Sequence, residues 1–279
     1  MRNILKSLYP IFLGIFCLIS CTNNPKISTY DFKSNKNVST LNVSLPTGQI
    51  DICGWNEDFI EITATNYLYS LIVSDQNLIR FHSEEINNAF NLNIYNPDPL
   101  INAKIFLKIK IPFLLDNINI STNNATCQIS DTFGNFNLTG KKSLINGDFK
   151  NSTVKINLID GTINATFDMT SSSDVLLSNE QGETNINIIK MGENSFISTN
   201  TFDGNINLVL SSTIPYFLIS SASVPHILEL LTSSPKIFEN NDYKLFINNT
   251  SRENPELQIF LNNQSGKTKI NNAFFIDVN

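Results

Sequence analysis

Apolar and polar residues alternate with a period of two over most of the chain beyond residue 40. In the run 41–45 the apolar side chains are separated by Asn42 and Ser44, and lysines alternate with the apolar residues of 105–111. A period of two places alternate side chains on one face of a strand, so each run predicts a strand with one buried face. Such runs lie at 41–45, 50–52, 60–62, 105–111, 118–120, 136–138, 245–247 and 257–261. The pattern therefore predicts an all-β protein.

A longer repeat overlies this alternation from residue 131 onward, where glycine turns lead into short strands. Gly161, Gly182 and Gly204 recur at a spacing of about 21 positions, whereas Gly134, Gly147 and Gly161 recur at about 13. The longer spacing suits one turn of a β-solenoid, in which successive rungs stack about 4.8 Å apart. The shorter spacing indicates two corners per turn. We therefore expect a parallel β-helix or β-roll solenoid with about 20–22 residues per full turn.

The residues that recur with this period have structural explanations. Glycine suits tight corners that need a positive φ. Asparagine, the commonest polar residue of this half, tolerates the same backbone region and can form ladders of side-chain amides along stacked rungs. Phenylalanines recur about once per turn, which favours a stacked aromatic core over a ligand-binding aromatic platform. They are Phe136, Phe149, Phe167, Phe196, Phe202 and Phe217.

The first twenty-one residues have the layout of a bacterial lipoprotein signal. Arg2 and Lys6 precede a broken apolar run at 8–19, and a small residue then precedes Cys21. A secretory segment of this kind is removed, so we expect residues 1–20 to be a signal peptide and Cys21 to carry lipid. The alternative is an uncleaved signal anchor or transmembrane helix, although a membrane span needs about 20 predominantly apolar residues.

The mature chain divides into a tether and one domain. Residues 21–40 are polar and predict a flexible tether between lipid and domain. Residues 41–279 predict a single β-solenoid domain, with its more regular repeats at 131–221 and a C-terminal capping region at 222–279. Within that region, residues 223–231 fit either a short capping helix or another strand.

Charge and composition narrow the class of partner. Cleavage removes Arg2 and Lys6, so 17 of the 19 basic residues remain against 25 acidic ones and the net charge goes from −6 to −8. An acidic, Asn-rich protein offers no electrostatic footprint for nucleic acid. Thr22, rather than Asp, follows the lipidated cysteine. The absence of Asp there favours the outer membrane or cell surface over retention at the inner membrane.

Candidate chemistry is sparse, and we expect no cofactor or metal site. Cys53 and Cys127 remain as a pair of thiols in an exported domain, which makes them a disulfide candidate. His82 and His226 are the only histidines, too few for a site of several imidazoles. An enzymatic alternative is a β-helix polysaccharide lyase or hydrolase with carboxylates on neighbouring rungs. Its carboxylates would come from Asp148, Asp160, Asp168 and Asp203.

Three stretches carry a resemblance to a known family. They are Leu-Asn-Val-Ser-Leu-Pro-Thr-Gly-Gln-Ile-Asp-Ile from Leu41, Leu-Lys-Ile-Lys-Ile-Pro from Leu107 followed by Ile-Asn-Ile-Ser-Thr, and the serial Gly-x-Ile-x-Ile rungs that end in Ser-Gly-Lys-Thr-Lys-Ile. The chain from Thr40 onward resembles the "putative adhesin" domain of bacterial envelope proteins, which is allied to the heads of autotransporter adhesins. The resemblance implies a right-handed β-helix or β-roll and no defined catalytic residues. Where relatives place glycine, this chain has Asn124-Ala125, which leaves the register of that rung open.

Together these observations favour a lipid-anchored envelope protein without catalytic activity, an adhesin or surface binding module. Its membrane contact would be the N-terminal lipid, and its ligand a host, matrix or polysaccharide component. Two alternatives remain at this point. One is a structural or stress-linked envelope component with no external ligand, and the other is the polysaccharide-degrading enzyme.

Overall fold

The computed structural model describes residues 25–69, 79–96, 103–211, 216–222, 236–239, 243–248 and 257–273. Within these ranges the protein is all-β, with no helix and with fourteen strands in one sheet that is not closed. The strands are β1 (Lys26–Lys33), β2 (Thr40–Trp55), β3 (Glu61–Leu68), β4 (Arg80–Ile86), β5 (Ala89–Tyr95), β6 (Ala103–Pro112), β7 (Asn117–Asp168), β8 (Asp174–Lys190), β9 (Ser195–Ser211), β10 (Tyr216–Ala222), β11 (Lys236–Glu239), β12 (Tyr243–Asn248), β13 (Leu257–Ser265) and β14 (Thr268–Ala273).

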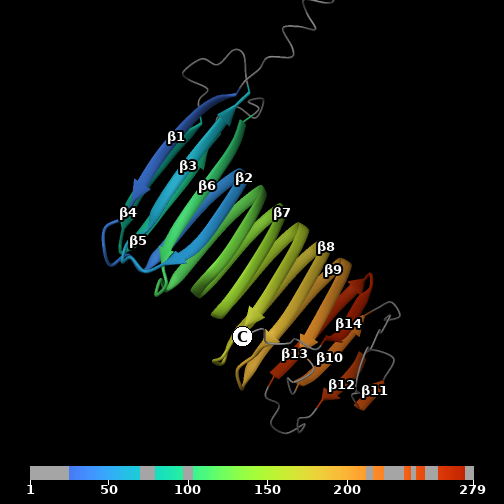
Figure 1. Ribbon diagram of the computed structural model, residues 1–279. Helices are drawn as coiled ribbons and strands as arrows, with labels where there is room; N and C mark the ends of the chain where they lie inside the picture. Colours follow the sequence, from blue (N-terminus) through green and yellow to red (C-terminus); the bar gives the residue numbers. More distant parts are fainter. Residues whose placement is uncertain are drawn as a thin grey trace, which may run out of the picture.

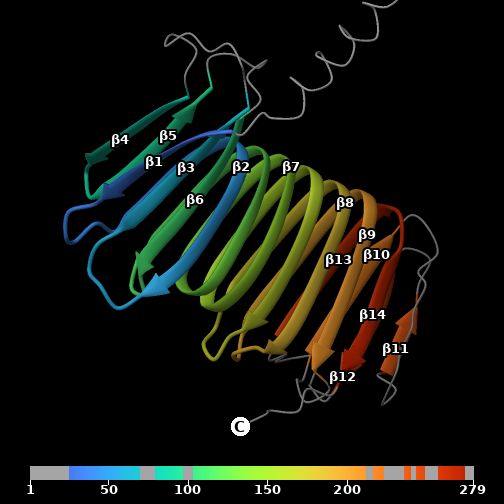
Figure 2. The ribbon, with the colours of Figure 1, turned by 45° about the horizontal axis from the view of Figure 1, so that its top comes forward.

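The long strands lie side by side in parallel register. β2 pairs with β7, β7 with β8 and β8 with β9, all parallel. Figures 1 and 2 show the ribbon of β7 passing back and forth, segment beside segment, between β2 and β8. The partners Asn164 on β7 and Asn185 on β8 are 21 positions apart in the sequence, and Asn185 and its partner Asn207 on β9 are 22 apart. Within β7 the side-chain partners Asn146 and Asn164 are 18 apart, which is shorter than the predicted spacing.

The sheet folds over on itself, and the core lies between its two layers. The first half of β2 pairs with β5 and its second half with β6. The bend between the halves is at Pro46-Thr47-Gly48. The strand segments paired in register with residues 49–53 form one layer, and we call its outer surface the front face. The segments paired in register with residues 40–44 form the other layer, and we call its outer surface the back face. Side chains at alternate positions of both layers, such as Leu41 and Ile50, are fully buried.

A stack of phenylalanine rings occupies the middle of this core. Phe136, Phe149 and Phe167 are all buried. The ring centroids of Phe136 and Phe149 are 5.2 Å apart, and those of Phe149 and Phe167 are 5.6 Å apart. The predicted aromatic core is confirmed for these three residues.

The aromatic stack does not continue into β9 as predicted. Phe202 is 59% exposed, and Phe196 is half-buried, with its ring 5.4 Å from that of Phe260. The period of two explains the difference, because Thr199 and Thr201 occupy the buried positions of this segment and turn their even-numbered neighbours outward. The side chain of Phe217 lies outside the described residues.

Glycine and asparagine form several of the corners, as the sequence predicts, but the corner predicted at Gly147 is wrong. Gly147 is buried in the extended part of β7, between the groove residues Asn146 and Asp148. Gly134 and Gly182 have φ values of 115° and 119°, and Asn151 and Asn194 have values of 44° and 59°. A Cβ on Gly182 would collide with the backbone carbonyl of Gly161 on the preceding turn. These corners therefore need glycine both for its backbone freedom and for the close approach of stacked turns.

Two buried asparagines hold the corners from the inside. The Nδ2 atom of Asn179 donates to the carbonyl oxygens of Gly161 and Glu183 at 3.2 and 3.1 Å. The Nδ2 atom of Asn263 donates to the carbonyl oxygen of Gly204 at 3.2 Å. Both residues are at most 1% exposed. Sequence reasoning assigned asparagine to corners and outer ladders and did not anticipate these internal amides.

The N-terminal end differs from the prediction in two ways. Residues 26–33, expected to belong to a flexible tether, form β1, which pairs antiparallel with β3. β4 and β5 also pair antiparallel, so this end is not purely parallel. Phe32 packs against the core, and its ring centroid is 6.2 Å from that of Phe81. The alternation of Tyr30 and Phe32 was the signal for β1, but it spans too few residues to stand out in a polar segment.

Other predictions fall outside the described residues or are resolved by the register. The signal segment 1–20, Cys21 and the segment 223–231 lie outside those residues. Ala125 lies opposite Gly48 in the pairing of β2 with β7, which settles the register left open at Asn124-Ala125. Among the described residues, no helix is long and apolar enough to cross a membrane.

Candidate functional site

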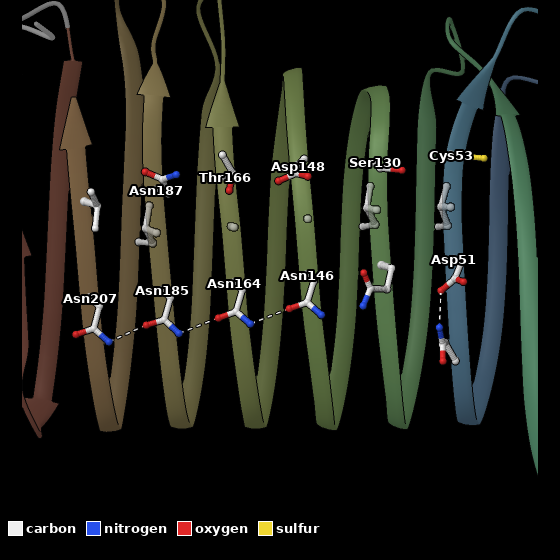
Figure 3. Close-up of a pocket in the computed structure, with 18 residues that line it drawn as sticks. Asp51, Cys53, Ser130, Asn146, Asp148, Asn164, Thr166, Asn185, Asn187 and Asn207 are labelled. Carbon is white, nitrogen blue, oxygen red and sulfur yellow. Dashed lines mark hydrogen bonds between the residues drawn. The ribbon is translucent and has the colours of Figure 1, made fainter. Parts of the chain in front are cut away.

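A shallow groove of about 730 Å³ runs along the front face, across β2, β7, β8 and β9. Figure 3 shows that its side chains come from successive passes of the chain. The residues that line it are Gln49, Asp51, Ile52, Cys53, Gln128, Ile129, Ser130, Asn146, Gly147, Asp148, Asn164, Ala165, Thr166, Asn185, Ile186, Asn187, Asn207 and Val209. Most of the side chains that point into it are uncharged hydrogen-bonding groups.

A continuous row of asparagine amides forms the floor of the groove, and we call Asn146, Asn164, Asn185 and Asn207 the asparagine ladder. The Nδ2 atom of Asn164 donates to Oδ1 of Asn146 at 2.7 Å, and Nδ2 of Asn185 donates to Oδ1 of Asn164 at 2.8 Å. The Nδ2 atom of Asn207 donates to Oδ1 of Asn185 at 2.7 Å. The predicted amide ladder is thus confirmed, and Figure 3 shows all three bonds.

The local sequence explains why these asparagines line up. Asn164, Asn185 and Asn207 each follow a corner glycine by three residues. Since corners stack on corners, a fixed distance from the corner places the three amides one above another, and the period of two points them outward. A side-chain amide has two N–H donors and two acceptor lone pairs, so each ladder bond leaves hydrogen-bonding capacity on both atoms. Gly-x-x-Asn is therefore the sequence signal for this surface.

A second row of side chains lies two residues further along each strand. It comprises Cys53, Ser130, Asp148, Thr166 and Asn187, which Figure 3 shows above the ladder. The Oδ1 atom of Asn187 is buried and accepts no hydrogen bond from the described residues. The two rows together present amide, hydroxyl, thiol and carboxylate groups to one groove.

The four aspartates considered for catalysis do not meet at one point. Asp148 lies in the groove, whereas Asp160 and Asp203 lie at the corner, in register with Gln181 between them. Asp168 pairs in register with Lys190 at the far end of its strand. The carboxylate cluster required by the enzymatic alternative is therefore not formed.

The basic residue Lys150 lies near three aspartates, Asp131, Asp148 and Asp168. Lys150 forms an ion pair with Asp131, with 2.7 Å between Nζ and Oδ1. The hydrogen bond to Asp131 raises the pKa of Lys150, and the charges of Asp131, Asp168 and Asp148 add to this effect. Lys150 is therefore a charged, paired residue rather than a proton acceptor for catalysis.

The two thiols are free and lie apart, in contrast to the disulfide expectation. Cys127 is in register with Ile50, and Cys53 is in register with Ser130, three residues further along. Three residues of strand correspond to about 10 Å, and a disulfide needs Cα atoms within about 7 Å. Cys127 points into the core while Cys53 lines the groove. Burial raises the pKa of the Cys127 thiol to about 12.

The histidines add no site within the described residues. His82 lies on β4 with its side chain 69% exposed and its Nε2 3.6 Å from Glu84, and His226 lies outside the described residues. No group of three or more His, Cys, Asp or Glu residues is placed to hold a metal ion in the part of the chain that the structure describes.

Comparison with known proteins yields structural neighbours of low identity. No family model and no curated protein matches the chain. The structure is similar to that of a "putative adhesin" from Bacteroides fragilis, with 14% identity over 90% of this chain and 99% of the other and a TM-score of 0.45. It is also similar to a "putative cell adhesion protein" from Clostridium sporogenes, with 15% identity over 89% of this chain and 100% of the other and a TM-score of 0.37. At TM-scores below 0.5 these likenesses do not establish a shared function.

Proposed function

We propose that this protein is a lipid-anchored envelope protein without catalytic activity, whose front-face groove binds an extended, uncharged polysaccharide. The asparagine ladder carries the proposal. It repeats one donor and acceptor group on successive passes of the chain, which suits a ligand that repeats its own hydroxyl groups along its length. Hydroxyls both donate and accept, as side-chain amides do.

The charges of the groove favour a neutral ligand over an acidic one. Asp51 and Asp148 lie among its lining residues, and no lysine or arginine does. Carboxylates accept hydrogen bonds from hydroxyls but repel anionic sugars. Such a groove would bind through many modest contacts, each worth about 0.5–1.5 kcal/mol net.

The proposal includes the architecture and the anchor expected from the sequence. A parallel β-solenoid is supported by the parallel register of β7, β8 and β9 and by ladder partners that are 21 and 22 positions apart. Its right-handed sense is proposed from the family resemblance. An adhesin-like, surface-displayed role agrees with a long polar face that carries the groove. Lipid on Cys21 would hold the domain at the outer membrane or cell surface.

The groove is tested by glycan binding with a matched pair of variants. Asn164→Ala removes the amide that makes two ladder bonds, and we expect about a tenfold loss of affinity for a neutral polysaccharide. Asn200→Ala is the control. Asn200 also accepts an amide hydrogen bond, from Asn262 at 2.9 Å. It lies before the Gly204 corner, whereas Asn207 of the ladder lies after it. Asn200 therefore lies on the back face and Asn207 on the front face. Equal losses in both variants, or no binding across a panel of neutral polysaccharides, would refute the groove assignment.

Location and catalysis are tested separately. Protease treatment of intact cells should degrade the protein, and full protection would contradict surface display and favour the structural role. Incubation with neutral and acidic polysaccharides should release no oligosaccharides. Release that is abolished by Asp148→Ala would establish the enzyme instead.

A further inference from the structure

An apolar and aromatic patch lies on the outer surface of β1, β3 and β6, where it comprises Ile27, Tyr67, Lys104 and Phe106. We call these residues the aromatic patch, together with Tyr69, which directly follows β3 and has the same parity as Tyr67. Ile27 is in register with Tyr67, and Tyr67 with Lys104, so the three side chains share one face. The ring centroids of Tyr67 and Phe106 are 5.6 Å apart, and Nζ of Lys104 is 5.3 Å from the centre of the Phe106 ring. Ile27 is 57% exposed and Tyr69 39% exposed.

The patch lies where the folded part of the chain begins. β1 starts at Lys26, which is in register with Leu68, next to Tyr69. Only residues 22–25 therefore separate the expected lipid on Cys21 from the first strand. The path from Cys21 to Lys26 is five residue steps and spans at most about 18 Å, so the patch cannot lie far from the surface in which the lipid is embedded. The predicted twenty-residue tether would have imposed no such limit.

The composition of the patch suits the boundary between water and lipid. Tyrosine is enriched at membrane interfaces because its ring is apolar and its hydroxyl is polar, and lysine can extend its amine toward the headgroups. β1 is solvent-exposed over most of its length, and Ile27 and Tyr69 of the patch are exposed, so no other described element covers these two side chains. The groove is not involved, because it is carried by β2, β7, β8 and β9.

We infer that the aromatic patch docks on the lipid surface to which Cys21 is anchored and sets the orientation of the domain; this inference rests on the lipid anchor of the proposed function. The contact is apolar and aromatic rather than electrostatic, because the mature chain carries a net charge of −8. It therefore persists on zwitterionic membranes and at high salt.

Tryptophan quenching by brominated phosphatidylcholine vesicles tests this contact in the mature, lipidated protein. Trp55 is the only tryptophan. It lies opposite Pro112, six residues along β6 from Phe106 and eight from Lys104, or about 20–26 Å from these two patch residues. Tyr69→Trp combined with Trp55→Phe moves the probe into the patch. We expect quenching of the tryptophan at position 69 to be several-fold stronger than that of Trp55 in the unaltered protein.

Two further substitutions in the Tyr69→Trp background provide the matched comparison. Ile27→Asp places a charge in the patch and should reduce quenching to the level of Trp55. Phe202→Asp changes a side chain of nearly equal exposure, 59% against 57%, far along the sheet on β9, and should leave quenching unchanged. Both positions are exposed, so neither change disturbs the core.

Separate measurements distinguish a failure of the proposed lipid anchor from a failure of the proposed contact between the aromatic patch and the membrane. An intact mass without acyl chains would refute the anchor. Acylated protein whose position-69 tryptophan is quenched no more than Trp55 would refute the patch. Dimers in analytical ultracentrifugation that Ile27→Asp converts to monomers, with quenching unchanged, would assign the patch to a contact between copies and likewise overturn the inference.

Discussion

Replacement of Phe149 by alanine tests whether the ring stack holds the middle of the protein together. The Phe149 side chain is fully buried between Phe136 and Phe167, at centroid distances of 5.2 and 5.6 Å. A buried phenylalanine-to-alanine change costs about 3–5 kcal/mol through lost transfer energy and the residual cavity. Each aromatic pair adds about 0.5–1.5 kcal/mol. We therefore expect Phe149→Ala to lower the free energy of unfolding by about 5 kcal/mol.

Phe149→Leu separates the two contributions. It keeps most of the buried apolar volume and removes both ring contacts, so it should cost about 1–2 kcal/mol. Phe202→Ala is the control of the same residue type, because Phe202 is 59% exposed and its loss should cost less than about 0.5 kcal/mol. Denaturant titration followed by circular dichroism measures all three variants.

Hydrogen exchange adds a test of where the damage occurs. Each pass of the chain contacts mainly its neighbours, so Phe149→Ala should increase exchange in β7 while β1 and β3 keep wild-type protection. Phe149→Ala that costs no more than Phe202→Ala, or exchange that rises equally along the whole sheet, would refute the stacked-ring explanation.

Further predictions concern a corner and the two thiols. Gly182→Ala should destabilise the protein by about 3 kcal/mol in thermal unfolding, because φ is 119° and the new Cβ meets the Gly161 carbonyl. The control is Ala125→Gly, opposite Gly48, which should cost only about 1 kcal/mol. Equal costs for the two variants would contradict this reasoning. A thiol reagent should label Cys53 in the folded protein and Cys127 only in denaturant, and fewer than two thiols in denatured, unreduced protein would show a disulfide after all. Burial raises the pKa of the Cys127 thiol from 9.0 to about 12. The contribution of the buried neutral thiol to the free energy of unfolding is therefore present below pH 9 and is lost as the pH rises toward 12, by up to about 4 kcal/mol. Denaturation as a function of pH should therefore show a steeper loss in the wild type than in Cys127→Val over that window, and parallel curves would refute the effect.

The features that depend on neighbouring residues could be predicted well. The period of two placed Leu41 and Ile50 inward, and corner chemistry placed a positive φ at Gly134 and Gly182. The amide ladder was predicted as a kind of structure, and Gly-x-x-Asn could have located it at Asn164. Where the same rules failed, the reason was local too: Phe202 has the wrong parity for the core, and β1 alternates over too few residues to be recognised.

The features that depend on distant residues required the tertiary structure. The sequence contained Cys53 and Cys127 but could not show that they lie three residues out of register on opposite sides of the sheet. It contained Asp148 and Asp203 but could not show that one lies in the groove and the other at a corner.

The sequence by itself determined which side chains face inward and where the chain turns, because both follow from the geometry of a few consecutive residues. The tertiary structure decided which amides, thiols and carboxylates become neighbours. Register is the physical reason, since a change of a single residue in the length of any turn shifts every later partner by one position and moves its side chains to the other face. The step of 18 positions from Asn146 to Asn164 and the step of 21 from Asn164 to Asn185 are such lengths, and pairing between distant backbone segments fixes them.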